Sequence, residues 1–400
     1  MKKKLLVTAC SMEVGGIERS LAGMLGLIDY ERYDVDLLLF SRKGEFLPLL
    51  DSRCNLLPEI PKCASLLKPI KEVFLSGHLL MGVTRAAAKI VVTNRYKHSG
   101  ELPDAVVFAY LQAYWDSSIA LLPGLKTPYD AAISFMWPHH YVAKKVRAKR
   151  KIAWVHTDYS KAALDYKKDL AIWQSFDKIA AVSSECGRAF TKVYPSLAGK
   201  MATVENILSV GFVRKQAEEF EPEEMRYHGY TRLLTTGRFC YAKAFDVAVD
   251  ICKILVDRGE KIRWYAVGYG SEVHNVEKKI AEHDLSDNFL LLGKKLNPYP
   301  YMKSCDIYVQ PSRYEGKAVT VREAQMLGRP VVITDYPTAR AQVRDGFDAL
   351  ISPMNAESVA EDIRRLMADS RLRETLASNA YGGDYSCDRQ IEEIYKLIEG

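Results

Sequence analysis

Residues 306–324 read DIYVQPSRYEGKAVTVREA, a strand, loop and helix pattern that is typical of an α/β fold. The first five residues form an apolar run typical of a strand buried on both faces, and the second half predicts a helix. Glu315 falls in the loop between them, and Glu323 falls two turns into the helix. A helix N-terminus offers backbone N–H groups and a partial positive charge, so it is suited to bind an anion. A diphosphate held there, with a sugar at each end, would have one carboxylate on either side.

On both sides of this stretch, short apolar runs alternate with helical segments, and the pattern covers both halves of the chain. We expect strands at residues 5–9, 35–40, 105–110, 131–135, 152–156 and 178–183, and again at 232–236, 262–267, 289–292, 306–310, 330–334 and 349–352. Strands that alternate with helices predict right-handed βαβ units and parallel sheets. Because the pattern begins twice, we predict an α/β fold of two Rossmann-like domains whose parallel sheets face a central cleft.

The domain boundaries follow from the same pattern. A chain of 400 residues is too long for one core. We place an N-terminal domain over residues 1–205, a polar, Glu-rich linker over 206–230, a C-terminal domain over 231–385 and a final helix over 386–400.

The overall composition is that of a globular enzyme, with 48% hydrophobic and 26% charged residues. No apolar segment approaches the ~18 residues of a membrane span. The Lys-rich N-terminus precedes an apolar run that stops by Cys10, which favours a buried strand over a signal peptide. The eight cysteines are scattered without metal or redox spacing. We therefore expect a cytoplasmic protein with reduced thiols.

Three further motifs follow predicted strands of the second half. Gly237-Arg238 with Lys243 follows the first strand, Gly268-Tyr269-Gly270 the second, and Lys294-Lys295-Leu296 the third. In open α/β sheets ligands bind at the carboxyl ends of the strands, so these motifs and the Glu315 loop are expected at one edge. Arg238 and Lys243 are both placed to reach a diphosphate.

This set of motifs resembles the family 4 retaining glycosyltransferases, which have the GT-B architecture. Glu315 and Glu323 match the family's two glutamates separated by seven residues, and Gly237, Arg238 and Lys243 match its basic motif. The resemblance is most specific over residues 230–355. In the first half it rests on GGIE at residues 15–18 and WVHTD at residues 154–158.

The resemblance implies a role for each of these residues. Glu323 would hold the ribose of the nucleotide, Glu315 would contact the donor sugar, and Arg238 and Lys243 would neutralise the leaving diphosphate. His156, beside the reacting carbon, completes the implied catalytic set with Arg238, Lys243 and Glu315. The other implied donor-binding residues are Gly15, Gly16, Gly237, Gly268, Lys295, Leu296, Gly316, Lys317, Ala318, Val319 and Thr320.

The implied reaction moves a hexosyl unit from a nucleotide-diphosphate sugar, with UDP as the expected nucleotide, to a saccharide or lipid-linked acceptor in cell-surface polysaccharide synthesis. No Asp-x-Asp pair follows a strand, so we expect no metal and no other cofactor. Front-face attack, with the leaving phosphate accepting the acceptor proton, is what the family implies. Lys317 stands where the family often has an aromatic residue, and Ala318 where it often has glycine, which leaves the donor sugar open.

Other functions, and purely structural roles for some of these residues, also fit the sequence. A nucleotide-sugar epimerase of the same fold would need N-domain carboxylates, for which only Asp116 and Asp158 are candidates. A non-catalytic relative would lack Glu315, Arg238 or Lys243. A nicotinamide dehydrogenase is excluded, because the first turn lacks G-x-G-x-x-G. Gly15-Gly16 also fits a simple tight turn, and His156 also fits a hydrogen-bonded core histidine.

Charge separates the two halves and suggests a further partner. Residues 1–200 carry 29 Lys and Arg against 19 Asp and Glu, whereas residues 201–400 carry 27 against 31. Two basic segments stand out, Lys144–Lys151 and the amphipathic Ser65–Lys97. We expect the first domain to bind the acceptor and to touch an anionic membrane surface, at the inner face of the membrane, and we expect no nucleic-acid partner. The alternatives are a solvated helix end for the first segment and packing on the sheet for the second.

Overall fold

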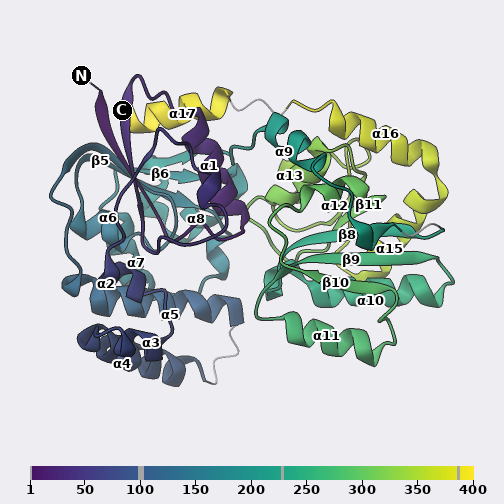
Figure 1. The fold of residues 1–400 in the computed structure, drawn as a ribbon, viewed down its shortest axis with the longest axis horizontal. Coiled ribbons are helices and arrows are strands. Elements are labelled where there is room, and N and C mark those ends of the chain that lie inside the picture. Colours follow the sequence, from purple (N-terminus) through teal and green to yellow (C-terminus); the bar gives the residue numbers. More distant parts are fainter. Residues whose placement is uncertain (1, 98–102, 227–228, 385–387) are drawn as a thin grey trace. The chain divides into compact units, whose positions relative to one another are not determined.

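The computed structural model describes residues 2–97, 103–226, 229–384 and 388–400. These residues form two compact units, one of residues 1–207 with 388–400, and one of residues 208–387 (Figure 1). No described helix combines the length and the apolar character that crossing a bilayer requires.

The first unit contains a seven-stranded parallel sheet in the order β3-β2-β1-β4-β5-β6-β7. Its strands are β1 (Lys3–Ala9), β2 (Tyr33–Leu39), β3 (Asn55–Leu56), β4 (Pro128–Ser134), β5 (Arg147–Val155), β6 (Lys178–Ala181) and β7 (Met201–Thr203). Its helices are α1 (Gly16–Leu27), α2 (Pro61–Ser65), α3 (Ile70–Leu75), α4 (Leu79–Tyr96), α5 (Pro103–Ser118), α6 (His140–Lys145), α7 (Tyr166–Trp173), α8 (Ser184–Val193) and α17 (Asp388–Glu399). The apolar runs of the central strands are buried, as a sheet covered on both faces requires.

The strand expected at residues 105–110 is wrong, because this run lies inside α5. Its β-branched and aromatic residues favour a strand locally. However, the buried positions Ala105, Ala109, Gln112 and Trp115 recur at helical spacing, while Val107 is 51% exposed. Two edge strands, β3 and β7, were not predicted, because two or three residues are too few to show a period.

The second unit contains a six-stranded parallel sheet in the order β10-β9-β8-β11-β12-β13. Its strands are β8 (Thr231–Arg238), β9 (Ile262–Tyr269), β10 (Phe289–Gly293), β11 (Ile307–Gln310), β12 (Val331–Thr334) and β13 (Leu350–Ser352). Its helices are α9 (Val210–Ala217), α10 (Phe245–Asp257), α11 (Val273–Glu282), α12 (Tyr299–Ser304), α13 (Val319–Met326), α14 (Ala339–Gln342), α15 (Ala356–Ala368) and α16 (Ser370–Tyr381). The six strands predicted for this half are confirmed, with ends that differ by at most two residues.

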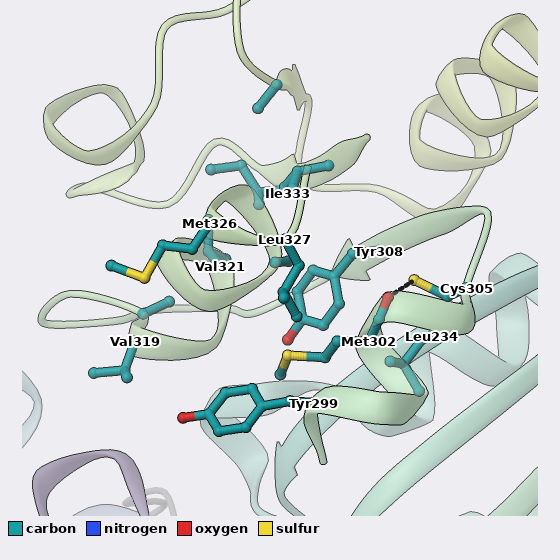
Figure 2. Packing of buried hydrophobic residues seen from close by; sticks show 14 of the residues in the cluster. Leu234, Tyr299, Met302, Cys305, Tyr308, Val319, Val321, Met326, Leu327 and Ile333 are labelled. Atoms are coloured by element: carbon teal, nitrogen blue, oxygen red, sulfur yellow. Dashed lines mark hydrogen bonds between the residues drawn. The ribbon is translucent and has the colours of Figure 1, made fainter. Parts of the chain in front are cut away.

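Two hydrophobic clusters fill the second unit. One contains residues of α12, β11, α13 and β12, and Figure 2 shows several of them, including Tyr299, Met302 and Tyr308. The other contains residues of α10, β9 and α15. Strands whose side chains enter one or the other cluster form the rigid scaffold for the loops at the sheet edge.

The segment expected as a linker, residues 206–230, contains helix α9, and its residues from Leu208 onward belong to the second unit. Ser209 caps this helix, since its hydroxyl accepts a 3.2 Å hydrogen bond from the Phe212 N–H. Val213 and Ala217 are buried in the cluster that Figure 2 shows. The helix has only eight residues, and the Glu-rich stretch that follows it gives the segment its polar composition. Residues 227 and 228 lie outside the described residues.

The final helix, α17, packs on the first unit. Tyr395 stacks on Tyr33 with ring centroids 5.5 Å apart. Glu399 accepts hydrogen bonds from the Tyr33 hydroxyl at 2.6 Å and from Arg32 at 2.7 Å. These contacts join the last described helix to the second strand of the chain.

Candidate functional site

The second sheet reverses its direction of winding between β8 and β11. From β8 the chain adds β9 and β10 on one side, and then it returns to add β11, β12 and β13 on the other. The loops after β8 and β11 therefore diverge at the point where open α/β sheets bind ligands. These two loops contain the Lys243 motif and the Glu315 motif, so both motifs lie at the switch point.

Side chains of the two loops meet directly. The Lys243 Nζ donates a 2.6 Å hydrogen bond to Glu315 Oε1. The Ser312 hydroxyl donates to the same carboxylate oxygen at 2.6 Å, and the Thr338 hydroxyl donates to the Glu315 backbone carbonyl at 3.0 Å. The side chains of Lys243 and Glu315 are only 19% and 10% exposed. They are held in place and do not belong to a solvated surface.

Arg313 joins the same loops a second time, and no sequence motif predicted this contact. Its guanidinium donates to the Tyr241 carbonyl at 2.8 Å and to both carboxylate oxygens of Asp246 at 2.9 and 2.6 Å. Burial alone would raise the pKa of Asp246, but the hydrogen bonds and charge of Arg313 outweigh it and lower that pKa. Asp246 is therefore ionised at neutral pH, and the pair fixes the start of α10 beside the Glu315 loop.

The N-terminus of α13 is buttressed from several elements. Gln342 accepts a 3.0 Å hydrogen bond from the Ala318 N–H and donates one of 2.5 Å to the Ala318 carbonyl. The Thr320 hydroxyl donates to Gln310 Oε1 at 3.1 Å, and the Tyr308 hydroxyl donates to the same oxygen at 2.8 Å. The first N–H groups of α13 thus point from a firmly held helix start, as an anion site requires.

Glu323 is the fifth residue of α13 and is fully buried. Its Oε1 accepts a 2.8 Å hydrogen bond from the hydroxyl of Tyr299, which begins α12. The sequence placed this carboxylate at a ligand-facing position, whereas the structure places it beneath the surface of the unit. A ligand reaches it only after the groups that cover it have moved.

Glycine is required where β8 and β9 run side by side. Gly237 and Gly268 are direct partners in the two strands, and both lie in the strands themselves, not in the turns that follow them. Gly268 has a φ of +156°, and a Cβ there would lie 1.8 Å from the carbonyl oxygen of Gly237. These glycines let the two strand ends approach closely beneath the Lys243 loop.

The remaining predicted residues of this unit surround that edge. Arg238 ends β8 and is exposed. Lys295 donates a 3.0 Å hydrogen bond to Glu224, whose pKa is held down by a backbone N–H and by this ammonium. Leu296 is 58% exposed. Gly316 and Val319 are buried, and Lys317 is half-buried.

The first unit contains the other predicted residues. Gly15 precedes α1 and Gly16 begins it. A Cβ at Gly15 would lie 2.2 Å from Glu18 Oε2, so the Glu18 carboxylate folds back over this turn. Asp158, a possible acid or base for an epimerase, accepts hydrogen bonds from the Ser160 hydroxyl and N–H at 2.7 and 3.1 Å. Asp116, the other such carboxylate, pairs with His140 at 3.0 Å.

His156 follows β5, and its Nε2 lies 2.8 Å from the Phe135 carbonyl oxygen. A carbonyl accepts but does not donate, so Nε2 carries the proton. Burial lowers the pKa of His156 to about 4, which leaves the ring neutral at pH 7. Within the described part of the chain its buried Nδ1 makes no hydrogen bond, so this unprotonated nitrogen can accept one.

Metal-binding clusters are absent from the described residues: no three His, Cys, Asp or Glu side chains there are grouped to hold an ion. Charged groups at the switch point include the ammonium of Lys243 and the carboxylate of Glu315, with the guanidinium of Arg238 at the adjoining strand end.

Comparison with known proteins finds a family match within the same unit. Residues 216–382 match the family described as Glycosyl transferases group 1. The matched residues lie inside the second unit and include all the motifs predicted for that unit. The chain is 28% identical over 151 residues to alpha-D-kanosaminyltransferase from Streptomyces kanamyceticus, covering 37% of this chain and 39% of that protein. It is 25% identical over 205 residues to poly(ribitol-phosphate) alpha-N-acetylglucosaminyltransferase from Staphylococcus aureus (strain COL), covering 49% and 40%. The chain thus spans about two fifths of the length of these relatives.

Structural comparison covers nearly the whole chain. It superposes on the crystal structure of Anabaena Alr3699/HepE in complex with UDP-glucose with a TM-score of 0.70 and 16% identity, covering 98% of this chain and 99% of that one. The chain has the GT-B fold. The two parallel sheets predicted from the sequence are those of this GT-B fold, and the site described above lies in its second unit. Since unrelated activities share folds, the activity has to be argued from the site.

Proposed function

We propose that the chain is a retaining glycosyltransferase. It would transfer a hexosyl unit from a UDP-sugar to a saccharide or lipid-linked acceptor in cell-surface polysaccharide synthesis. The observation that carries the proposal is the 2.6 Å contact of Lys243 with Glu315 at the switch point, beside the N-terminus of α13. The names of the two glycosyltransferase relatives support the transfer, and the UDP-glucose complex of HepE supports the choice of nucleotide.

The basic residues would act on the leaving group. When a glycosyl donor loses its nucleoside diphosphate, negative charge accumulates on the departing phosphate. Cations and N–H groups already in place stabilise this charge more in the transition state than in the ground state. We assign this role to Arg238, to Lys243 and to the amides of Gly316, Lys317 and Val319. The Ala318 N–H is excluded because it donates to Gln342. The same groups make a metal unnecessary in our proposal.

The two glutamates would bind the two sugars of the donor. Glu315 accepts hydrogen bonds from Lys243 and Ser312, and it retains acceptor capacity for a sugar hydroxyl because a carboxylate has about four acceptor positions. We assign Glu323 to the ribose, which requires that a ribose hydroxyl take the place of the Tyr299 hydroxyl. The backbone at Lys295 and Leu296 would lie beside the base.

For the stereochemical course we adopt retention, which the resemblance to the family 4 glycosyltransferases implies. The acceptor hydroxyl would attack from the face that the diphosphate leaves, and its proton would pass to the leaving phosphate. We assign acceptor binding to the first unit, with Gly15 and Gly16 at its first turn. Neutral His156 would contribute hydrogen bonding, not charge.

An epimerase of the same fold is the second candidate, and the structure disfavours it. That reaction needs carboxylates of the first unit to move protons. Asp116 is paired with His140, and Asp158 caps the short turn that follows it. Both carboxylates are therefore occupied by contacts of the first unit itself.

The experiment combines binding and turnover. The purified chain is screened by thermal shift against UDP, GDP, ADP and TDP, and then it is incubated with the matching nucleotide sugars to measure slow donor hydrolysis. We expect stabilisation by UDP and hydrolysis of a UDP-sugar. Lys243→Ala should lower the rate of hydrolysis by about 10²-fold or more. Lys278→Ala, which changes an exposed lysine of α11, is the matched control. Absence of any nucleotide effect would refute the proposal.

A further inference from the structure

Apolar side chains cover the outer face of α4 and the end of α3 in the first unit. This α3–α4 apolar surface consists of Leu75, Leu79, Leu80, Val83, Ile90 and Val91, which are between 56% and 78% exposed. Single exposed apolar residues are normal, but a contiguous group of this kind marks an interaction site.

Helix α4 is apolar on two opposite sides. Its inner side buries Met81, Ala88 and Val92. Leu79, Val83 and Ile90 recur at spacings of four and seven residues, so they share a stripe on the other side. Figure 1 shows α4 as the outermost helix of this layer, with α5 between it and the sheet. The outer stripe therefore does not serve the core of the unit.

The surface is held rigidly from behind. The Arg85 guanidinium donates to the Ser65 and Lys68 carbonyls at 2.5 and 2.6 Å, and it lies 4.8 Å from the ring centroid of Tyr114 in α5. At Gly82 an added Cβ would lie 2.7 Å from the Phe74 ring, so α3 packs closely on α4. Ordered helices, not a loose hairpin, thus present the apolar side chains.

Exposed cations accompany the apolar stripe. Lys68, Lys71, Lys89, Arg95 and Lys97 are exposed, and Glu72 is the only acidic residue between positions 65 and 97. Arg85 of the same segment is buried, as are Leu66, Val73 and Met81. The amphipathic composition of Ser65–Lys97 therefore does not by itself show which of its side chains face outward.

Several cations of the other basic segment, Lys144–Lys151, make contacts within the first unit. Lys145 and Lys151 donate to the carbonyls of Ala120 and Ala143 at 3.3 and 2.9 Å, and Arg147 donates to the carbonyl of Lys126. Lys149 pairs with Asp130 at 2.7 Å. These side chains hold the end of α6 and the start of β5 in place.

We propose that the α3–α4 apolar surface docks on an anionic lipid bilayer, with α4 lying in the plane of the interface. Apolar side chains would enter the headgroup region while the lysines and arginines contact anionic lipid. A second copy of the chain is the weaker occupant, because it would bring two basic surfaces of the same sign together. The proposal concerns the first unit alone and does not depend on the donor chemistry of the second.

Co-sedimentation with vesicles tests this docking on the full chain. Phosphatidylcholine vesicles with and without phosphatidylglycerol are compared at low and high salt. We expect binding to the anionic vesicles at low salt that weakens as salt rises. Leu79→Glu/Val83→Glu should weaken it by at least about tenfold, since two apolar anchors become acidic. The control is Leu27→Glu/Met354→Glu, which changes the charge equally at residues 45% and 52% exposed on other elements.

Each outcome decides the matter. If the wild type stays in the supernatant with anionic vesicles at low salt, or if the control double variant loses binding equally, the docking proposal is wrong. Sedimentation velocity covers the other occupant, because a dimer that Leu79→Glu/Val83→Glu dissociates, together with no vesicle binding, would assign the surface to a second copy. Thermal shift with UDP is measured on all variants, and an unchanged shift shows that the donor site is intact.

Discussion

The ammonium of Lys243 and the carboxylate of Glu315 lie 2.6 Å apart although 72 residues separate them in the chain. Each comes from a different loop at the switch point of the second sheet. In the absence of donor, each charge compensates the other, so neither is left buried and unpaired. A donor diphosphate would draw Lys243 toward itself and leave Glu315 available to a sugar hydroxyl.

Replacing Lys243 by Ala should lower turnover by about 10²-fold or more, because one preorganised charge-stabilising group is lost. Arg238→Ala should act in the same direction. The measurement is the rate of transfer or of donor hydrolysis at saturating UDP-sugar. Full turnover in both single variants would contradict the assignment of these cations to the leaving group.

Variants of the buried pair Tyr299 and Glu323 distinguish an effect on UDP binding from an effect on stability. Tyr299→Phe removes a hydrogen bond to a buried carboxyl group, so we expect a loss of about 1.5–3 kcal/mol in the free energy of unfolding. Glu323→Gln keeps the shape and should weaken UDP binding more than it lowers stability. Urea unfolding and calorimetric titration with UDP measure the two effects. Unchanged UDP affinity in Glu323→Gln would show that this residue is structural alone.

Activity should survive EDTA. The motivation is the placement of Lys243 and Arg238 where a divalent ion would otherwise neutralise the diphosphate. Turnover is measured before and after prolonged chelation and gel filtration. Complete loss that Mg²⁺ or Mn²⁺ restores would show that these cations do not suffice.

Gly268→Ala should destabilise the chain far more than Gly259→Ala. Both glycines have positive φ values, +156° and +79°, but only at Gly268 would the Cβ meet an atom, the Gly237 carbonyl oxygen at 1.8 Å. Gly259→Ala then costs about 1–2 kcal/mol for the left-handed backbone alone. Chemical denaturation of the two variants gives the comparison, and equal losses would mean that the strand ends separate easily.

The Glu399 carboxylate makes the stability of the first unit depend on pH. The Tyr33 hydroxyl, with Lys3 and Arg32, lowers the pKa of Glu399 to about 2, below its ordinary value of 4.5. This contribution to stability is complete above pH 4.5 and is lost as pH falls toward 2. Glu399→Gln should therefore reduce the change in melting temperature between these two pH values. Glu393→Gln, a change at an acidic residue on the same helix, should leave that slope as it is in the wild type.

Local sequence signals predicted most of the second unit. The strand, loop and helix around Glu315 were readable because apolar runs flank a loop with distinctive residues. The partners that hold this site were not, since Asp246 for Arg313, Gln342 for Ala318 and Tyr299 for Glu323 lie 24 or more residues away. No local period encodes such pairs, which exist only once the sheet has formed.

In the first unit, tertiary packing overrode local preference. Residues 105–110 are rich in β-branched and aromatic side chains, yet the burial of Trp115 and Ala109 against neighbouring elements selects a helix. For α4 the sequence showed the amphipathic composition but not the direction of its faces. That direction depends on Arg85, whose inward position follows from two backbone carbonyls near the start of α3.

The return of α17 to the first unit has a consequence for biosynthesis. Tyr33 emerges early from the ribosome, but its partners Tyr395 and Glu399 are made only after the whole second unit. Until then helix α17 does not cover the edge formed by Arg32 and Tyr33. The first unit therefore lacks its last helix while the second unit folds. Domains usually fold in the order of synthesis. Here the earlier unit is completed last, so a nascent chain released before residue 388 would carry an exposed aromatic face for chaperones to hold.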